Sequence, residues 1–288
     1  MFVHLHCHSD RTIGKSLIKP FALVEHYKSI GAKSACITDN GNLNSAIQLF
    51  NACRKFKIKP IFGIEVNVTK NREIKDKVTK SLVLLAKDIV GFRNLVKIAT
   101  AGSMFFYYIN RVDLEIIKMY HKGVICLTSD IRGYCADRFF LNGENGIEKC
   151  HEDLSEIFGK DLYWEIQPNM IDSQRTYNEA ILKVASSRTD MNIVASGDPH
   201  YLFEGDHQFH VEYLNARNSK NPYWTYPFKM PSHVLSEDEI CFLLDMLHGE
   251  GFVSENEIVQ NAIWNSTVIC ESVSEFDLKD GVKIPCFL

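Results

Sequence analysis

Three histidines stand at every second position near the start of the chain, in the stretch Phe2–Asp10 that reads FVHLHCHSD. Side chains of a β-strand alternate between its two faces, so His4, His6 and His8 would point the same way. Imidazoles that converge at the end of a strand can clamp a borderline divalent metal ion. The alternative is a partly exposed strand whose histidines share no function, so further ligands must be sought elsewhere in the chain.

The size and composition of the chain narrow the classes of protein that fit. Its 288 residues suffice for one large α/β barrel or two modest domains, and 45% hydrophobic with 24% charged residues is typical of a globular protein. A net charge of −4 excludes a basic clamp that holds nucleic acid by bulk electrostatics. The nine cysteines form no Cys-x-x-Cys pair, which argues against a zinc ribbon and favours reduced thiols.

We expect no membrane contact and no targeting segment. The chain has no apolar run that approaches the roughly 20 residues needed to span a membrane. Only two apolar residues separate Met1 from His4, which leaves no room for the apolar core of a signal peptide. Together with the reduced thiols, these features predict a cytoplasmic protein.

Short apolar runs alternate with amphipathic segments along the chain. Runs of this kind are typical of buried parallel strands, and the longer segments between them carry apolar residues at helical spacing. One helix has Pro20 in its first turn and Gly31 just past its end, where each residue is favoured. The predicted strands are 2–5, 34–38, 60–68, 82–86, 124–128, 162–166 and 193–196, and the predicted helices are 19–30, 43–57, 92–101, 147–158, 175–187 and 206–216.

This alternation predicts parallel βα units, closed into a barrel rather than laid out as an open sheet. The barrel is expected over about 1–216. A polar, proline-containing loop at 215–231 and a mostly helical tail, together covering about 217–288, should follow it. The segment 70–80 holds five basic and two acidic residues, and we expect a solvated hairpin tip there.

Polar side chains gather at the ends of the predicted strands, where barrel enzymes hold their active sites. His6 and His8 end the first strand, Glu65 lies within the third, and Asp198 and His200 follow the seventh. Corresponding places on the other strands hold Asp39, Asn40, Asp130, Glu165 and Gln167. Imidazole and carboxylate suit Zn²⁺, Mn²⁺ or Fe²⁺, and such an ion can polarise a phosphoryl oxygen or activate a bound water.

Several stretches of the sequence resemble motifs of the polymerase and histidinol phosphatase (PHP) family. They are FVHLHCHSD at 2–10, ITDNGNL at 37–43, IKPIFGIEV at 58–66, LVLLAK and GFRNL at 82–87 and 91–95, NRVD at 110–113, and GDPHYL at 197–202. In order and spacing they are most similar to the branch that forms the N-terminal PHP domain of bacterial DNA polymerase III alpha subunits. The resemblance implies a distorted (β/α)7 TIM-like barrel and a single PHP domain over 1–288, without the polymerase palm.

The resemblance also implies one intact metal site. In the family, nine ligands hold up to three metal ions, and the four positions of one site are His6, His8, Glu65 and Asp198 in this chain. We therefore expect one bound divalent ion (Zn, Mn or Fe), with two or three ions as the upper limit.

The other two implied sites have lost ligands. The second shares Glu65, but its remaining positions hold Ser81, a poor ligand, and Asp130, which can still coordinate. The third retains His200, whereas Lys15 and Asn40 stand at its other two positions. The second site is therefore predicted to be damaged and the third largely lost.

Lys15 suggests a specific hypothesis. Its ammonium would replace part of the charge of the third metal, supplying electrostatics without ligand geometry. The alternative is a solvated loop lysine in a site that has drifted. With Lys15 included, the candidate catalytic residues are Asp198, His200 and Lys15.

Three functions remain open at this point. A replication-associated PHP domain can be a weak metal-dependent 3′–5′ exonuclease acting on the 3′ end of single-stranded DNA. It can also be a non-catalytic platform for the polymerase core, on the same longer chain or a separate one, and for a proofreading subunit. The third is a small-molecule phosphoesterase of the histidinol phosphatase type. Nucleotide transfer is not expected from this chain alone, because no polymerase carboxylates can be carried over.

Overall fold

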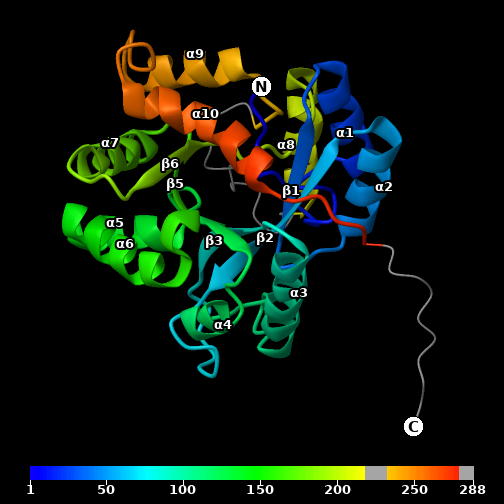
Figure 1. Ribbon diagram of the computed structural model, residues 1–288, viewed down its shortest axis with the longest axis horizontal. Helices are drawn as coiled ribbons and strands as arrows, with labels where there is room; N and C mark the ends of the chain where they lie inside the picture. The colour runs from blue at the N-terminus through cyan, green and yellow to red at the C-terminus, as the bar shows by residue number, and fades with distance from the viewer. Residues whose placement is uncertain (218–231, 279–288) are drawn as a thin grey trace.

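A six-stranded sheet forms the centre of the molecule in the computed structural model, which describes residues 1–217 and 232–278 (Figure 1). The strands lie in the sheet in the same order as in the chain, and the helices are arranged around the outside of the curled sheet (Figure 1). The strands are β1 (Ser34–Asn40), β2 (Lys59–Val68), β3 (Lys80–Ala86), β4 (Val124–Leu127), β5 (Leu162–Ile166) and β6 (Asn192–Ala195). The predicted α/β class with a distorted, TIM-like barrel is confirmed.

The direction of the strands differs from the expected all-parallel arrangement at one place. β1 and β2 pair in parallel, as do β4 with β5 and β5 with β6, but β3 runs antiparallel to both β2 and β4. A parallel neighbour requires a long crossover, usually a helix, and residues 69–79 between β2 and β3 form none. This segment is instead the turn of a hairpin, as its polar composition predicted.

The N-terminal segment is the second departure, because residues 2–5 do not form the expected strand. The segment nevertheless lies between the two outer strands of the sheet. Thr38 of β1 donates its N–H to the carbonyl of Cys7, and His8 donates its N–H to the carbonyl of Pro199, beyond β6. Side chains supply other partners that a ladder would give, since the Cys7 N–H binds the Thr38 hydroxyl and the His4 N–H binds the Tyr27 hydroxyl. The segment thus takes the place of a seventh strand.

The predicted helices are all present, with boundaries that shift by a few residues. Two short helices between β3 and β5, at Leu114–Met119 and Tyr134–Asn142, were not predicted, and neither were two single turns of 3₁₀ helix. The helices are α1 (Pro20–Ser29), α2 (Ala46–Phe56), α3 (Ile89–Met104), α4 (Leu114–Met119), α5 (Tyr134–Asn142), α6 (Glu144–Phe158), α7 (Asp172–Ser186), α8 (His207–Arg217), α9 (Glu237–His248) and α10 (Glu257–Ser272), with 3₁₀ turns η1 (Gly159–Asp161) and η2 (Glu204–Asp206).

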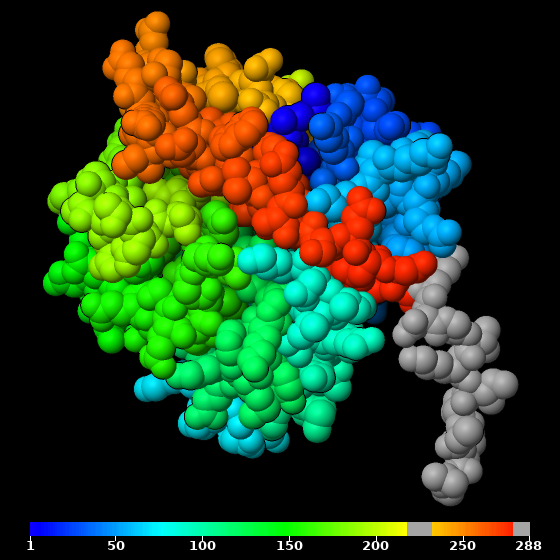
Figure 2. Space-filling view, viewed as in Figure 1, coloured from blue at the N-terminus to red at the C-terminus, as the bar shows by residue number. Residues whose placement is uncertain are grey.

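The helical tail packs onto the barrel. In α10, Asn265 donates to the carbonyl of Ile193 in β6, and the hydroxyl of Ser266 accepts the N–H of Val3. In the space-filling view, α10 runs across the face of the molecule toward the N-terminal residues (Figure 2). Of the loop expected at 215–231, the first three residues belong to α8 and the rest lie outside the described residues, as do 279–288. Within the described residues, no helix is both long and apolar enough to cross a membrane.

His4 is fixed in its neutral form inside the barrel. Its Nδ1 accepts the N–H of Gly197, so its Nε2 carries the proton and donates it to the carbonyl of Leu235. Burial lowers the pKa of His4 to about 4, although the bond to Leu235 opposes the shift. His4 is thus a packed histidine whose two ring nitrogens are both used by the backbone.

His4 predicts a specific acid sensitivity of the fold. Its pKa is lower in the folded than in the unfolded chain, so stability is fully present above pH 6.5 and is lost as the pH falls toward 4. Between pH 8 and pH 5 the loss from this one group should be about 2 kcal/mol of unfolding free energy. Urea unfolding of His4→Gln at both pH values should show a drop smaller by that amount. The control is His121→Gln, on the loop before β4, which should keep the full drop; an identical drop in His4→Gln would refute the assignment.

Candidate metal centre

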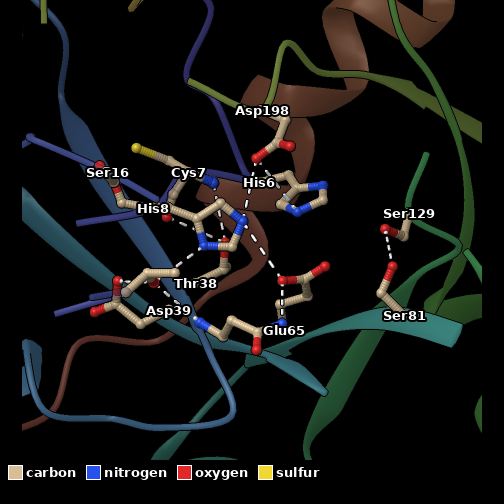
Figure 3. A network of polar contacts seen from close by, with 12 residues as sticks. His6, Cys7, His8, Ser16, Thr38, Asp39, Glu65, Ser81, Ser129 and Asp198 are labelled. Carbon is tan, nitrogen blue, oxygen red and sulfur yellow. Dashed lines mark hydrogen bonds and ion pairs between the residues drawn. The ribbon is translucent and has the colours of Figure 1, made fainter. Parts of the chain in front are cut away.

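Four predicted ligands from distant parts of the chain meet at one point inside the barrel. His6 and His8 come from the N-terminal segment, Glu65 from β2, and Asp198 from the turn after β6 (Figure 3). The His8 Nε2 lies 3.2 Å from Asp198 Oδ1 and 3.6 Å from Glu65 Oε2, and the His6 Nε2 lies 3.6 Å from Asp198 Oδ1. All four are buried, and His6, His8 and Asp198 form a group whose ligand atoms lie within 4.8 Å of one another.

The ring of His8 is oriented by a hydrogen-bond chain that starts at β1. Thr12 gives its hydroxyl proton to Asp39 Oδ1 at 2.8 Å, and the Thr12 hydroxyl oxygen lies 3.3 Å from His8 Nδ1. Because the only Thr12 proton is used, His8 Nδ1 must be the donor, and its Nε2 keeps a lone pair. Asp39 also accepts the N–H and the hydroxyl of Ser9, which fixes the loop that carries Thr12.

The ring of His6 is oriented in the same way from β5. Its Nδ1 lies 3.0 Å from Glu165 Oε1, which also accepts a hydrogen bond from Gln167. A carboxylate can only accept, so Nδ1 carries a proton, and Nε2 faces Asp198. Both histidines therefore present a ligand nitrogen toward the same point.

Asp198 is held in an uncommon backbone conformation, with a φ of +47°. This left-handed region is unfavourable for a residue with a Cβ, and such strain persists where surrounding contacts enforce it. The next histidine, His200, stacks on His8 with ring centroids 5.0 Å apart, and its Nε2 lies 3.4 Å from Asp198 Oδ2. The strained turn thus aims the carboxylate of Asp198 at both histidine rings.

The electrostatics of the pocket are those of a site that needs a cation. Burial opposes the charge on Asp198, but His200, His6 and His8 hold its pKa well below the usual range. Burial also opposes the charge on Glu65, but His8, Lys15 and His6 lower its pKa to about 2. Burial lowers the pKa of His6, but the carboxylates of Glu165, Asp198 and Glu65 outweigh it and raise that pKa to about 10. Without a metal ion, a second proton therefore occupies His6 Nε2, the position that a bound cation would take.

Two buried atoms at the centre of the pocket test the fit of a metal ion. His6 Nε2 and Asp198 Oδ1 face each other, and within the described part of the chain neither has a hydrogen-bond partner. Buried polar atoms are costly unless they are paired. Two imidazole nitrogens and two carboxylates are suitable ligands for Zn²⁺, Mn²⁺ or Fe²⁺, so the residues present fit one such ion.

Neighbouring positions have roles other than ligation. Asn40 donates its amide N–H to Glu65 Oε2 and exchanges hydrogen bonds with Asn67, so it positions the carboxylate of Glu65. The hydroxyls of Ser81 and Ser129 bond each other at 2.8 Å and lie to one side of the cluster (Figure 3). The side chains of Asn40 and Ser81 are thus engaged in hydrogen bonds, and neither is well suited to be a ligand of a second metal ion.

Asp130 pairs with an arginine and is not part of the cluster of His6, His8 and Asp198, so its role as a metal ligand stays a prediction. It is fully buried, and Arg132 binds both of its oxygens: the Arg132 N–H donates to Oδ1 at 2.8 Å, and Nε donates to Oδ2 at 2.7 Å. The same guanidinium reaches Asp198, with Nη2 3.1 Å from Oδ2. A carboxylate neutralised in this way is a poor partner for a divalent ion.

Lys15 lies at the edge of the same pocket. Its side chain is half-buried, and its charge is near enough to Glu65 to help lower the pKa of that carboxyl. Its carbonyl accepts a hydrogen bond from His210 Nε2 at 2.6 Å, which fixes the loop to α8. The role of the Lys15 ammonium therefore stays a prediction.

Sequence reasoning missed the residues that orient the ligands. Thr12 and Arg132 are not ligands and stand in loops, so nothing in their type marked them. Their distance along the chain from the site residues could have indicated them: Thr12 lies four residues after His8, and Arg132 lies two residues after Asp130. Both spacings allow a turn to bring the two side chains together.

The fold and the pocket define an α/β barrel with a candidate metal site of histidines and carboxylates. Residues 4–169, more than half of the chain, match the model of the PHP domain family. The chain therefore belongs to the PHP domain family, and the predicted membership is confirmed.

Its curated relatives include DNA polymerase III alpha subunits. The chain is 34% identical over 231 residues to the DNA polymerase III subunit alpha of Aquifex aeolicus, a match that covers 76% of this chain and 20% of that protein. It is 30% identical over 219 residues to the same subunit of Helicobacter pylori, covering 71% and 18%. The chain thus spans about a fifth of the length of these relatives. A solved structure from Bifidobacterium adolescentis, named as a metal-dependent phosphoesterase, matches with a TM-score of 0.47 at 11% identity, over 88% of this chain and 98% of that chain.

The hydrogen-bond chain through Thr12 predicts how metal affinity depends on it. Thr12→Val keeps the shape of the side chain but removes the acceptor for His8 Nδ1, so the ring loses its fixed tautomer. Metal affinity, measured by competition with a chromophoric chelator, should fall about 10- to 100-fold. Thr100→Val, on the exposed face of α3, is the matched control and should leave the affinity unchanged. Equal affinities in both variants would show that Thr12 does not orient the ligand.

Proposed function

We propose that this chain is the PHP domain of a DNA polymerase III alpha-type replicase, and that it acts as a weak metal-dependent 3′–5′ exonuclease on single-stranded DNA. The observation that carries the proposal is the complete first site. His6, His8, Glu65 and Asp198 converge with their ligand atoms oriented, and within the described residues the facing atoms of His6 and Asp198 have no hydrogen-bond partner. Such a site is costly to bury unless an ion is bound there.

The residues around this site provide the remaining requirements of phosphodiester hydrolysis. A bound divalent ion would polarise a phosphoryl oxygen and activate water. Lys15 and Arg132 bring positive charge to the pocket, where the phosphate of the 3′ nucleotide would bind. Burial lowers the pKa of His200 to about 4, against the opposing charge of Asp198, so its imidazole is neutral at pH 7 and can accept a proton.

The second candidate function, a non-catalytic platform for polymerase and proofreading partners, is favoured by a separate observation. The positions implied for the second and third metals hold Ser81, which binds Ser129, and Asn40, which binds Glu65. Hydrolysis in multi-metal sites relies on one ion for the attacking oxygen and another for the leaving oxygen. A chain with one ion would retain the fold and the metal while the chemistry weakens.

The proposal extends to the organisation of the whole chain. We infer that 1–288 is a single PHP domain, because α10 packs on β6 and on the N-terminal segment. The polymerase core would lie on the same longer chain or on a separate one. The eight described cysteines are free thiols, which supports the cytoplasm as the compartment.

Digestion of a single-stranded oligonucleotide labelled away from its 3′ end tests the function. The purified chain should shorten it from the 3′ end with Mn²⁺ or Zn²⁺ and not with EDTA. Asp198→Asn should reduce the rate by about 100-fold or more, because the site loses one of its two anionic ligands. The matched control is Asp190→Asn, on the loop before β6, which should keep full activity.

The other outcomes of this assay identify the alternatives. Metal-dependent hydrolysis of p-nitrophenyl phosphate without shortening of DNA would indicate a small-molecule phosphoesterase. A tightly bound ion with neither activity would contradict the exonuclease and favour the platform.

The role of Lys15 is tested separately. If its ammonium replaces the charge of a lost ion, Lys15→Ala should lower the exonuclease rate about tenfold. Lys15→Asp should increase the bound metal, because a carboxylate at this position would restore a ligand. Lys19→Ala, on the exposed loop before α1, is the control. Unchanged rate and unchanged metal content in both Lys15 variants would refute the hypothesis.

A further inference from the structure

The turn after β4 places a fixed cation beside the metal pocket. Arg132 Nη2 lies 2.6 Å from Asp130 Oδ2 and 3.1 Å from Asp198 Oδ2, so one guanidinium bridges two carboxylates. We propose that Arg132 takes the place of the second metal ion and forms, next to the single bound ion, a subsite for a phosphoryl group. This inference rests on the proposed phosphoester function and names the residue that would bind the phosphate.

The position of Arg132 is enforced by the backbone of the turn. Ser129 has a φ of +66°, and the N–H of Gly133 donates to the carbonyl of Asp130 at 2.8 Å. A Cβ at Gly133 would come within 2.5 Å of the carbonyl oxygen of Thr128 and 2.8 Å of that of Asp130, so only glycine allows this tight turn. The turn places Arg132 directly over the carboxylate of Asp130.

A second divalent ion cannot bind here without displacing the guanidinium. Besides the shared Glu65, the two positions implied for the second site hold one carboxylate, that of Asp130. Arg132 already binds both oxygens of this carboxylate, one through its backbone N–H and the other through its guanidinium. A buried carboxylate with an ion pair and two hydrogen bonds gives up its partner at high cost. Ser81, at the other position, bonds Ser129 and would be a weak ligand. The pocket therefore has room for one metal ion, with the Arg132 guanidinium in the position of the second.

The chemistry of the subsite points to a phosphoryl group. A guanidinium is planar, permanently charged and well matched to phosphate oxygens. The Arg132 side chain is 41% exposed, whereas Asp130 beneath it is 1% exposed, so an anion entering from solvent meets the cation and not the carboxylate. Arg132 also contacts Asp198, so an anion bound to the guanidinium lies next to the metal ligands. The competing interpretation is that Arg132 only neutralises Asp130.

Two measurements on the full chain distinguish these interpretations, and neither depends on catalysis. Metal content is determined by mass spectrometry after dialysis against excess Mn²⁺. Binding of inorganic phosphate is measured by calorimetry on the chain loaded with one equivalent of Mn²⁺, so that a second ion cannot replace Arg132. The unmodified chain should hold one ion and bind phosphate. Arg132→Gln should weaken phosphate binding at least tenfold and raise the metal content above one ion, because Asp130 is freed. Arg132→Lys keeps the charge without the planar fork, and it should keep one ion and bind phosphate with an intermediate affinity.

The matched control is Arg138→Gln, on α5, whose guanidinium binds the hydroxyl of Tyr134 away from the pocket; it should change neither quantity. Unchanged phosphate affinity in Arg132→Gln, or two ions in the unmodified chain, would overturn the inference. If Arg132→Gln does not fold, Arg132→Lys decides: the same phosphate affinity as the unmodified chain would refute a guanidinium subsite. A chain that binds phosphate through Arg132 but cleaves no DNA would contradict the exonuclease and leave this subsite intact.

Discussion

The buried carboxylates of Glu65 and Asp198 impose the constraint on which the rest of the structure depends. Both lie inside the barrel, 6% exposed, where an unpaired charge would be prohibitively costly. The chain compensates with cations and hydrogen-bond donors from each direction: the two histidines, Arg132 and the amide of Asn40. The histidines in turn require Glu165 and the Thr12–Asp39 pair to fix their protons. The carboxylates thus account for the groups that surround them, and the histidines account for the residues that orient their rings.

The path of the N-terminal segment follows from the same constraint. A regular strand would satisfy its backbone through a continuous ladder with β1 and β6. This segment uses side chains for part of that task, with the hydroxyls of Thr38 and Tyr27 as acceptors. His4 and Cys7 can then pack into the core while His6 and His8 reach the pocket. The loss of ladder bonds is offset by these side-chain acceptors.

The fold could be predicted from the sequence where the signal was local. Strands β1–β6 are apolar runs of the right length, and the proline and glycine at the ends of α1 mark its limits. The first run also reads as a strand, but whether it forms a ladder depends on Tyr27 and Thr38, whose contacts are set only in three dimensions. The direction of β3 was predicted wrongly, although the hairpin that determines it was predicted correctly. The polar segment after β2 predicted a hairpin, and a hairpin requires antiparallel strands.

The same division applies to the site. His6, His8, Glu65 and Asp198 could be predicted because the ends of barrel strands meet at one face, so position along the chain implies proximity. The binding partner of Asp130 could not be predicted, because a carboxylate two residues before an arginine can bind either that arginine or a metal ion. The turn at Gly133 decides between them by holding Arg132 over Asp130. Where the family resemblance implies further ligands, this chain has neutral Asn40 and Ser81 and cationic Lys15. Fewer anionic ligands together with more fixed cations favour a single divalent ion, as we propose, because a second ion would bring positive charge without partners for it.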